Sequence, residues 1–246
     1  MAALFGSVGV SPSPARPASP GAPATSARAH NRYFAGRSYP EAGPAAVSTE
    51  FVVPRLTCTS TNTGVGAGAF IYTRTAAADQ GGSHATVISA ASVQLFCLGG
   101  EPAPMPVVEL EGRQTYGPTR PHVGDLMRAT IIDSAQVLGV TLQDLTEHHT
   151  FALTRSTAAA PATTAAIGET TLKGVPSLTP GPLYPITDFG SIRFGGRING
   201  MLLGAAGGRA FDMIASTRVL QISTGQLSGR GRRKSRSAFR TIWKHA

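Results

Sequence analysis

The chain has few charged side chains, few aromatic side chains and no long hydrophobic runs. Only 14% of its 246 residues are charged, about half of what is usual in globular proteins. Ala, Gly, Ser, Thr and Pro take their place, and these residues suit strands, turns and loops better than charged surface helices. No stretch reaches the length of about eighteen apolar residues that is typical of a membrane-spanning helix. The sequence therefore predicts no membrane span.

A capped helical stripe is also missing from the sequence. Residues 157–166 are rich in Ala, but Pro161 and the threonines favour a loop that leads into a strand. From Val47 onward apolar and polar residues alternate, as in residues 126–132, and Gly or Pro interrupts the pattern at short intervals. Many short strands of this kind predict an all-β protein, an antiparallel two-sheet β-sandwich of jelly-roll type with no significant helix.

Residues 1–30 differ from the rest because they are rich in Pro, Ala and Ser and show no periodicity. They are interpreted as a disordered leader, with the domain spanning residues 31–246. Residues 2–10 are apolar, but no Lys or Arg precedes them. They are either the end of a truncated signal peptide or part of the leader.

The formal net charge is +9, from 22 basic and 13 acidic residues, and much of it lies near the C-terminus. Such a run is either a nucleic-acid, polyanion or membrane-surface patch, or a solvated loop before the last strand. Since no aromatic residues for base stacking are interleaved, the solvated loop is the favoured interpretation. The basic residues of this C-terminal run are Arg230, Arg232, Arg233, Lys234, Arg236, Arg240 and Lys244.

Several common chemistries find no support. His148 and His149 are adjacent, without the helical spacing of a zinc protease. The glycines of residues 64–68 are followed by no helix that could hold a dinucleotide, and no serine lies in a Gly-x-Ser-x-Gly turn. The sequence predicts neither a metal nor a cofactor.

Two acidic residues are candidates for chemistry. Glu169 is the only acid between Glu147 and Asp188, in a stretch of small and apolar residues. It is either a buried carboxyl group held by hydrogen bonds or a general base whose pKa burial has raised. Glu109 alternates with apolar neighbours on a predicted strand, where it is either a solvent-facing residue or a second group of the same site.

Six motifs occur in an order and spacing that resemble the eqolisins, the glutamic peptidases of fungi and bacteria, from about residue 31 to the C-terminus. The placement of Cys58 and Cys97 is similar to that in the bacterial branch of the family. The motifs are Phe34-Ala35-Gly36, Val52-Val53-Pro54 with Cys58 behind it, Val123-Gly124-Asp125, Asp144-Leu145-Thr146, the run from Asp188 to Phe194, and Ser237-Ala238-Phe239 with Trp243.

This resemblance implies a large concanavalin-like sandwich with its active site on the concave sheet. It also implies a monomeric, secreted peptidase that cleaves polypeptides at acidic pH, with Glu169 as general base and Glu109 lining the same cleft. Asp125 and Asp144 would be structural turn residues. Cys58 and Cys97 could be buried thiols or a pair; bacterial eqolisins carry cysteines at similar places, which favours a disulfide. Closing that loop would contribute roughly 4 kcal/mol.

The sequence departs from the family at the catalytic positions. The family's second catalytic residue is a glutamine, and Ala90 occupies that place in an ungapped comparison. Gln94 lies four positions further on, roughly 13 Å along an extended strand. Ala166 and Val107 stand where the family has tryptophans before the two glutamates. These departures imply a degenerate site with weakened or lost activity, and the alternative is a non-catalytic module that binds peptide or glycan.

Overall fold

Strands dominate the part of the chain that the structure describes. The computed structural model describes residues 29–31, 33–40, 46–59, 61–73, 87–134, 136–156, 163–171, 185–216, 219–229 and 236–244. These residues form sixteen strands and no helix, so none of them belongs to a helix that could cross a membrane. The expected leader lies outside the described residues except for its last two positions, and so does the part of the basic run from Arg230 to Ser235.

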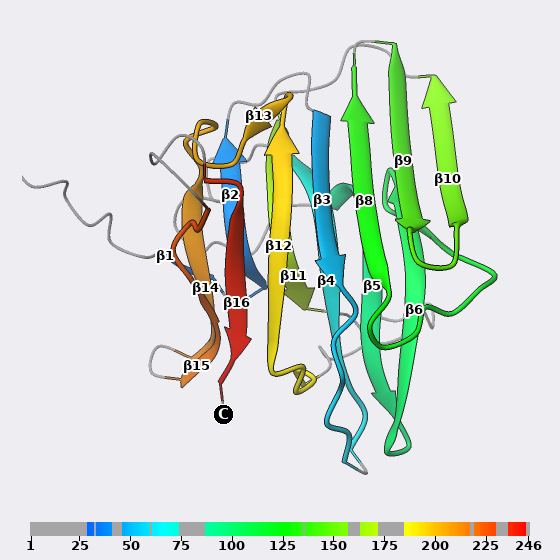
Figure 1. Ribbon diagram of the computed structural model, residues 1–246, viewed down its shortest axis with the longest axis vertical. Helices are drawn as coiled ribbons and strands as arrows, with labels where there is room; N and C mark the ends of the chain where they lie inside the picture. Colours follow the sequence, from blue (N-terminus) through cyan, green and yellow to red (C-terminus); the bar gives the residue numbers. More distant parts are fainter. Residues whose placement is uncertain are drawn as a thin grey trace, which may run out of the picture.

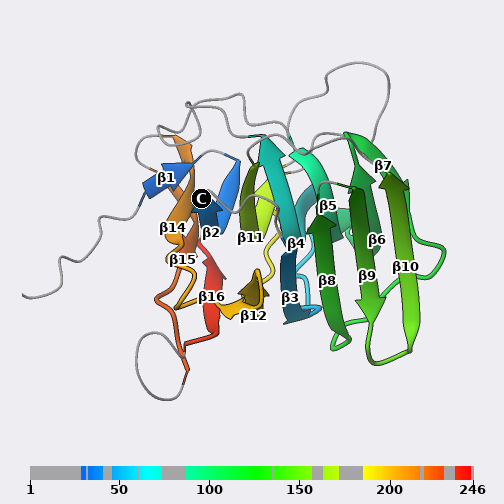
Figure 2. The same cartoon turned by 90° about the horizontal axis from the view of Figure 1, so that it is seen from above.

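The strands are stacked in two layers, as Figures 1 and 2 show. Their hydrogen bonds form one path that folds back on itself. The front layer consists of β10 (His149–Ser156), β9 (Val137–Asp144), β8 (Leu126–Asp133), β3 (Ala46–Val52), β12 (Ser191–Ile198) and β16 (Ala238–Trp243). The back layer consists of β2 (Phe34–Pro40), β11 (Thr163–Thr171), β4 (Thr63–Thr73), β5 (Val87–Leu98), β6 (Glu101–Leu110) and β7 (Arg113–Tyr116).

Two strands join the layers at one end of the molecule. β15 (Val219–Thr224) pairs with β16 of the front layer, and β14 (Arg209–Ser216) pairs with β2 of the back layer. The short β1 (Ala29–Asn31) and β13 (Met201–Leu202) pair with β14 and β12. All pairings are antiparallel except that of β1 with β14. The predicted all-β sandwich is confirmed, with the addition that hydrogen bonds continue from one layer to the other.

The alternation in the sequence explains the core between the layers. Along β8, residues 127, 129 and 131 are buried whereas their neighbours are exposed or half-buried. Phe51, Phe194 and Phe239 come from three adjacent strands of the front layer, and their rings contact one another with centroids 5.4 to 5.5 Å apart. Small residues of β4 and β11 lie in the same core, which lets the layers approach closely.

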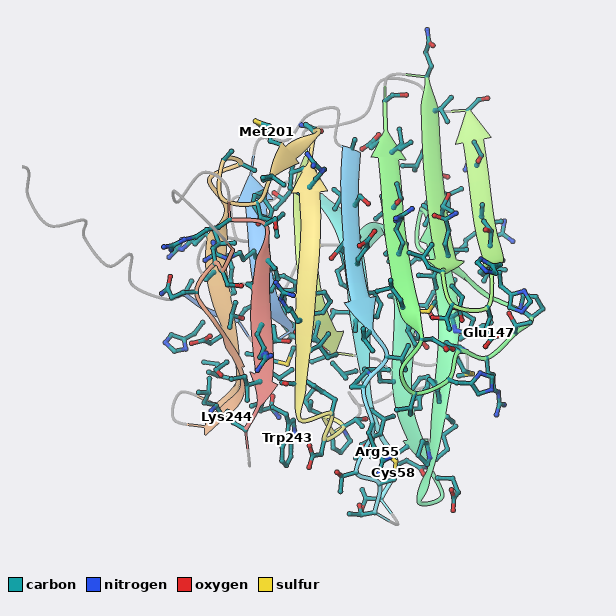
Figure 3. All side chains as sticks on the ribbon, in the orientation of Figure 1. Arg55, Cys58, Glu147, Met201, Trp243 and Lys244 are labelled. Atoms are coloured by element: carbon teal, nitrogen blue, oxygen red, sulfur yellow. A yellow bond between two sulfur atoms is a disulfide. The ribbon has the colours of Figure 1, made fainter. Side chains whose placement is uncertain are left out.

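Cys58 and Cys97 form a disulfide, which confirms the pairing expected from the resemblance. Their Cα atoms are 5.4 Å apart, and the bond spans 39 positions of sequence. It ties the segment after β3 to the end of β5, at the end of the molecule where Figure 3 labels Cys58. Because such bonds persist in oxidising compartments, the disulfide is consistent with an extracellular protein.

Candidate active site

Each strand of the back layer has one face toward the core and one face away from the front layer, which we call the outer face. On β5, Val93, Leu95 and Cys97 face the core, whereas Ser92 and Gln94 alternate with them on the outer face. On β6, Val108 faces the core and Glu109 the outer face. The face on which a side chain lies decides which of the expected site residues can meet.

Glu169 lies on the core side of β11. Its neighbours in register are Ala35 on β2 and Ala67 on β4, which both belong to the core between the layers. Its Oε1 accepts a short hydrogen bond from the hydroxyl of Thr241 on β16, across the interior. Glu169 and Thr241 are both 0% exposed. The expectation that Glu169 opens into a cleft shared with Glu109 is therefore wrong, because the alternation of β11 turns Glu169 inward.

The surroundings of Glu169 favour its neutral form. Burial raises the pKa of its carboxyl group well above the ordinary value, and the hydrogen bond from Thr241 lowers it only in part. Its second oxygen, Oε2, is buried and has no hydrogen-bond partner among the residues that the structure describes. An ionised carboxylate would be costly there, since the hydroxyl of Thr241 and a backbone group replace only part of the water that would solvate it.

A row of glycines brings the backbones close beside Glu169. Gly168 lies in register with Gly36 on β2 and Gly68 on β4. A Cβ atom on Gly168 would come within 2.1 Å of the carbonyl oxygen of Ala35. Gly168 also has a φ of 151°, which side chains disfavour. The glycines therefore permit the close packing of β2, β11 and β4 around the buried carboxyl group.

Glu109 lies on the outer face in a chain of polar contacts. Its Oε2 accepts a hydrogen bond of 3.0 Å from Nε2 of Gln114 on β7. Oε1 of Gln114 in turn accepts from Nε2 of Gln94 at 3.5 Å and from the hydroxyl of Tyr116 at 3.4 Å. Burial raises the pKa of Glu109, and the bond from Gln114 lowers it in part. Glu109 is half-buried and Gln114 exposed, so this carboxyl group can meet water.

In the structure, Gln114 connects Glu109 with Gln94. The sequence analysis had singled out Glu109 and Gln94 but not Gln114. Ala90 lies directly opposite Glu109, whereas Gln94 lies opposite Met105, four positions along β5. Gln114 lies opposite Glu109 on the other side and bridges the gap.

A turn signal could have revealed Gln114. Glu111 and Gly112 form a two-residue turn with φ of 50° and 77°, typical of a tight hairpin. Counting back from that turn pairs Leu110 with Arg113 and Glu109 with Gln114. The sequence therefore contained the register, although the contact with Gln94 needed the structure.

Asp125 and Asp144 hold turns, as expected. Oδ1 of Asp144 accepts hydrogen bonds from the backbone of Thr146 and Glu147 at 2.9 and 3.0 Å. Oδ2 of Asp125 accepts one from the backbone of His122 at 2.5 Å. These three bonds close loops at one end of the front layer, so these carboxylates replace backbone partners.

His122, Asp125 and Glu147 form a group with potential metal ligands within 4.8 Å of one another. They come from two loops, and Figure 3 shows Glu147 at the side edge of the molecule. The adjacent pair His148 and His149 is not part of this group. His122 and Asp125 are close in the sequence, but Glu147 comes from a separate loop, so no spacing pattern in the sequence joined the three.

Comparison with solved structures shows which fold this is. Scytalido-glutamic peptidase, solved with a peptide-based transition-state analogue, matches with a TM-score of 0.64 and 11% identity over 87% of this chain and 98% of that one. SCP-B, a member of the eqolisin family of peptidases solved with the tripeptide Ala-Ile-His, matches with a TM-score of 0.62, 12% identity and the same coverage. The chain therefore has the β-sandwich fold of the glutamic peptidases.

Sequence comparison adds no closer assignment. No family model matches the chain, and no curated protein matches it either. The fold is thus shared with glutamic peptidases, while the assignment of a function depends on the residues of this chain.

Proposed function

We propose that this protein is a secreted glutamic-type hydrolase of peptide bonds in which Glu109, rather than Glu169, is the general base. The observation that carries the proposal is the chain of contacts from Glu109 through Gln114 to Gln94 on the outer face of the back layer. It combines a carboxyl group of raised pKa with two amide side chains. The glutamic-peptidase fold supports the same conclusion.

Each group has a definite part in the proposed reaction. The ionised carboxylate of Glu109 takes a proton from a water molecule, which attacks the peptide carbonyl carbon. An amide N–H of the exposed Gln114 donates to the oxygen that becomes negatively charged, as an oxyanion hole does. Gln94, which is only 4% exposed, donates to Gln114 and holds it in place. Protonated Glu109 then gives its proton to the leaving amine.

The pKa of Glu109 sets the expected pH dependence. Burial raises this pKa above its ordinary value of 4.5, and only the ionised form can act as a base. Activity should therefore rise with pH through the raised pKa and be greatest in mildly acidic to neutral solution. Cleavage by the proposed mechanism requires no metal and should persist with a chelator such as EDTA.

The test compares two glutamine substitutions. Casein cleavage is measured from about pH 3 to 7 for the unsubstituted protein, Glu109→Gln and Glu169→Gln. We expect Glu109→Gln to lose at least about a hundredfold in kcat/KM, on the order of a lost catalytic acid–base group. Glu169→Gln should retain cleavage and the same pH profile. Loss in Glu169→Gln alone, with its fold intact by circular dichroism, would return the role of base to Glu169.

A specific observation also favours a second function, a peptide-binding module without cleavage. Gln114 already donates a hydrogen bond to one oxygen of Glu109. Gln94 and Tyr116 in turn donate to the amide oxygen of Gln114 and hold that side chain in place. In that case casein peptides bind to the unsubstituted protein with no product at any pH. Glu109→Gln would then weaken binding without changing a rate.

A further inference from the structure

Two arginines face each other on the side of the front layer that points away from the core. Arg193 on β12 lies directly opposite Arg240 on β16. Both side chains are exposed, and no acidic partner of either is found among the described residues. Like charges directly opposite on neighbouring strands destabilise a sheet. This arrangement therefore costs stability unless an anion binds between them.

Glu50, which lines the same hollow as the two arginines, is already paired with another arginine. Glu50 lies on β3, beside β12, and its Oε1 accepts hydrogen bonds from Nε and Nη2 of Arg128 at 2.9 and 2.6 Å. The carboxylate of Glu50 therefore already forms an ion pair with Arg128. The two guanidinium groups of Arg193 and Arg240 remain available to a ligand.

A hollow of about 500 Å³ lies beside these arginines. Its lining includes Gly195 and Ala238, which face each other in the register and leave room between the longer side chains. Val52 and Leu126, both exposed, form an apolar part of the wall. We call this site, defined by Arg193, Arg240 and the residues just named, the arginine hollow.

We propose that the arginine hollow binds an acidic polysaccharide through its carboxylate or sulfate groups. Guanidinium groups bind planar and tetrahedral anions through paired hydrogen bonds, and the exposed Val52 and Leu126 can contact the apolar face of a sugar ring. The net charge of +9 attracts a polyanion from a distance. This site lies on the front layer, apart from Glu109 on the back layer, and does not depend on the proposed hydrolysis.

The surroundings favour a polysaccharide over a nucleic acid. No exposed aromatic side chain lines the hollow, since its single aromatic residue, Phe51, is 2% exposed. Binding of single-stranded nucleic acid generally uses aromatic rings on which bases stack. The disulfide is consistent with an extracellular protein, which would meet acidic polysaccharides rather than the nucleic acids of the cell interior.

The test measures binding to heparin, which carries sulfate, and to polygalacturonate, which carries only carboxylate. Arg193→Gln/Arg240→Gln is compared with the matched control Arg113→Gln/Arg120→Gln, which removes two exposed charges from β7 and the loop after it. We expect binding to at least one polymer to weaken tenfold or more in the first variant and less than threefold in the control. Raising the salt concentration should weaken binding by the unsubstituted protein.

A second variant and an oligonucleotide competitor test whether the hollow prefers an acidic polysaccharide. Arg193→Lys/Arg240→Lys keeps the charge but loses the paired geometry, so its affinity should be intermediate. Equal weakening in the hollow variant and the control would overturn the proposal, because net charge alone would then explain binding. The same holds for no binding to either polymer, and for a single-stranded oligonucleotide that binds more tightly than both.

Discussion

Glu169 and Glu109 are both glutamates on strands of the back layer, yet they differ in exposure to water and in their hydrogen-bond partners. Glu169 lies between the layers, where Oε1 accepts from the hydroxyl of Thr241 on β16 and Oε2 has no partner within the described part of the chain. Glu109 lies on the outer face, half-buried, beside two glutamines and a tyrosine. Burial raises the pKa of both, but only Glu109 can exchange protons with water.

The comparison separates two uses of a raised pKa. A shifted carboxyl group is a candidate for catalysis only if substrate and water can reach it. The pKa of Glu169 is shifted, but substrate and water cannot reach this residue, since it is 0% exposed. The inner carboxyl group is buried in the core, whereas the outer one can meet water, which is why we propose Glu109 rather than Glu169 as the base.

The largest expected effect comes from breaking the packing beside Glu169. In Gly168→Ala, the new Cβ would meet the Ala35 carbonyl oxygen at 2.1 Å in a backbone conformation that side chains avoid. We expect the free energy of unfolding to fall by about 3 kcal/mol or more, measured by urea denaturation. The control is Gly139→Ala on β9, where the nearest atom is 4.0 Å away. A loss as large in the control would show that these strands tolerate no added methyl group.

A smaller effect is expected on the pH dependence of stability. The pKa of Glu169 is raised in the folded state, so between its ordinary value of about 4.5 and the raised value only the folded protein holds this proton. Stability should therefore be greatest below about pH 4.5 and fall as pH rises, with a slope of at most about 1.4 kcal/mol per pH unit from this group.

Glu169→Gln provides the check, because its side chain cannot ionise. Its unfolding free energy, measured by urea denaturation from about pH 4 to 9, should fall less steeply with pH. Burial also raises the pKa of Glu109 and Asp133, so a residual slope of the same sign should remain. An unchanged slope would mean that Glu169 is ionised in the folded protein.

The smallest expected effect is a change in the pKa of Glu109. Gln114→Leu removes the hydrogen bond that partly offsets the effect of burial, so the pKa of Glu109 should rise further. An NMR titration of the Glu109 side chain measures this shift. Because Gln114 is exposed, stability should change by less than about 1 kcal/mol. A lower pKa in the variant would contradict the described contact.

Much of the fold could be predicted from the sequence because its cause is local. Alternation along residues 126–132 sets which side chains enter the core, and the burial of Met127, Ala129 and Ile131 follows it. The disulfide between Cys58 and Cys97 was expected from the resemblance of the motifs. The arrangement of the site could not be predicted in the same way, since it depends on which face of β11 and of β6 meets the other layer.

The sequence by itself determined the strand pattern and the turns, since these depend on residue type and spacing along the chain, whereas the disulfide was expected only from the resemblance of the motifs. Only the tertiary structure decided that Glu169 points inward to Thr241 while Glu109 meets Gln114. The physical reason is that a strand's alternation defines two faces, but the packing of the second layer decides which of them loses contact with water.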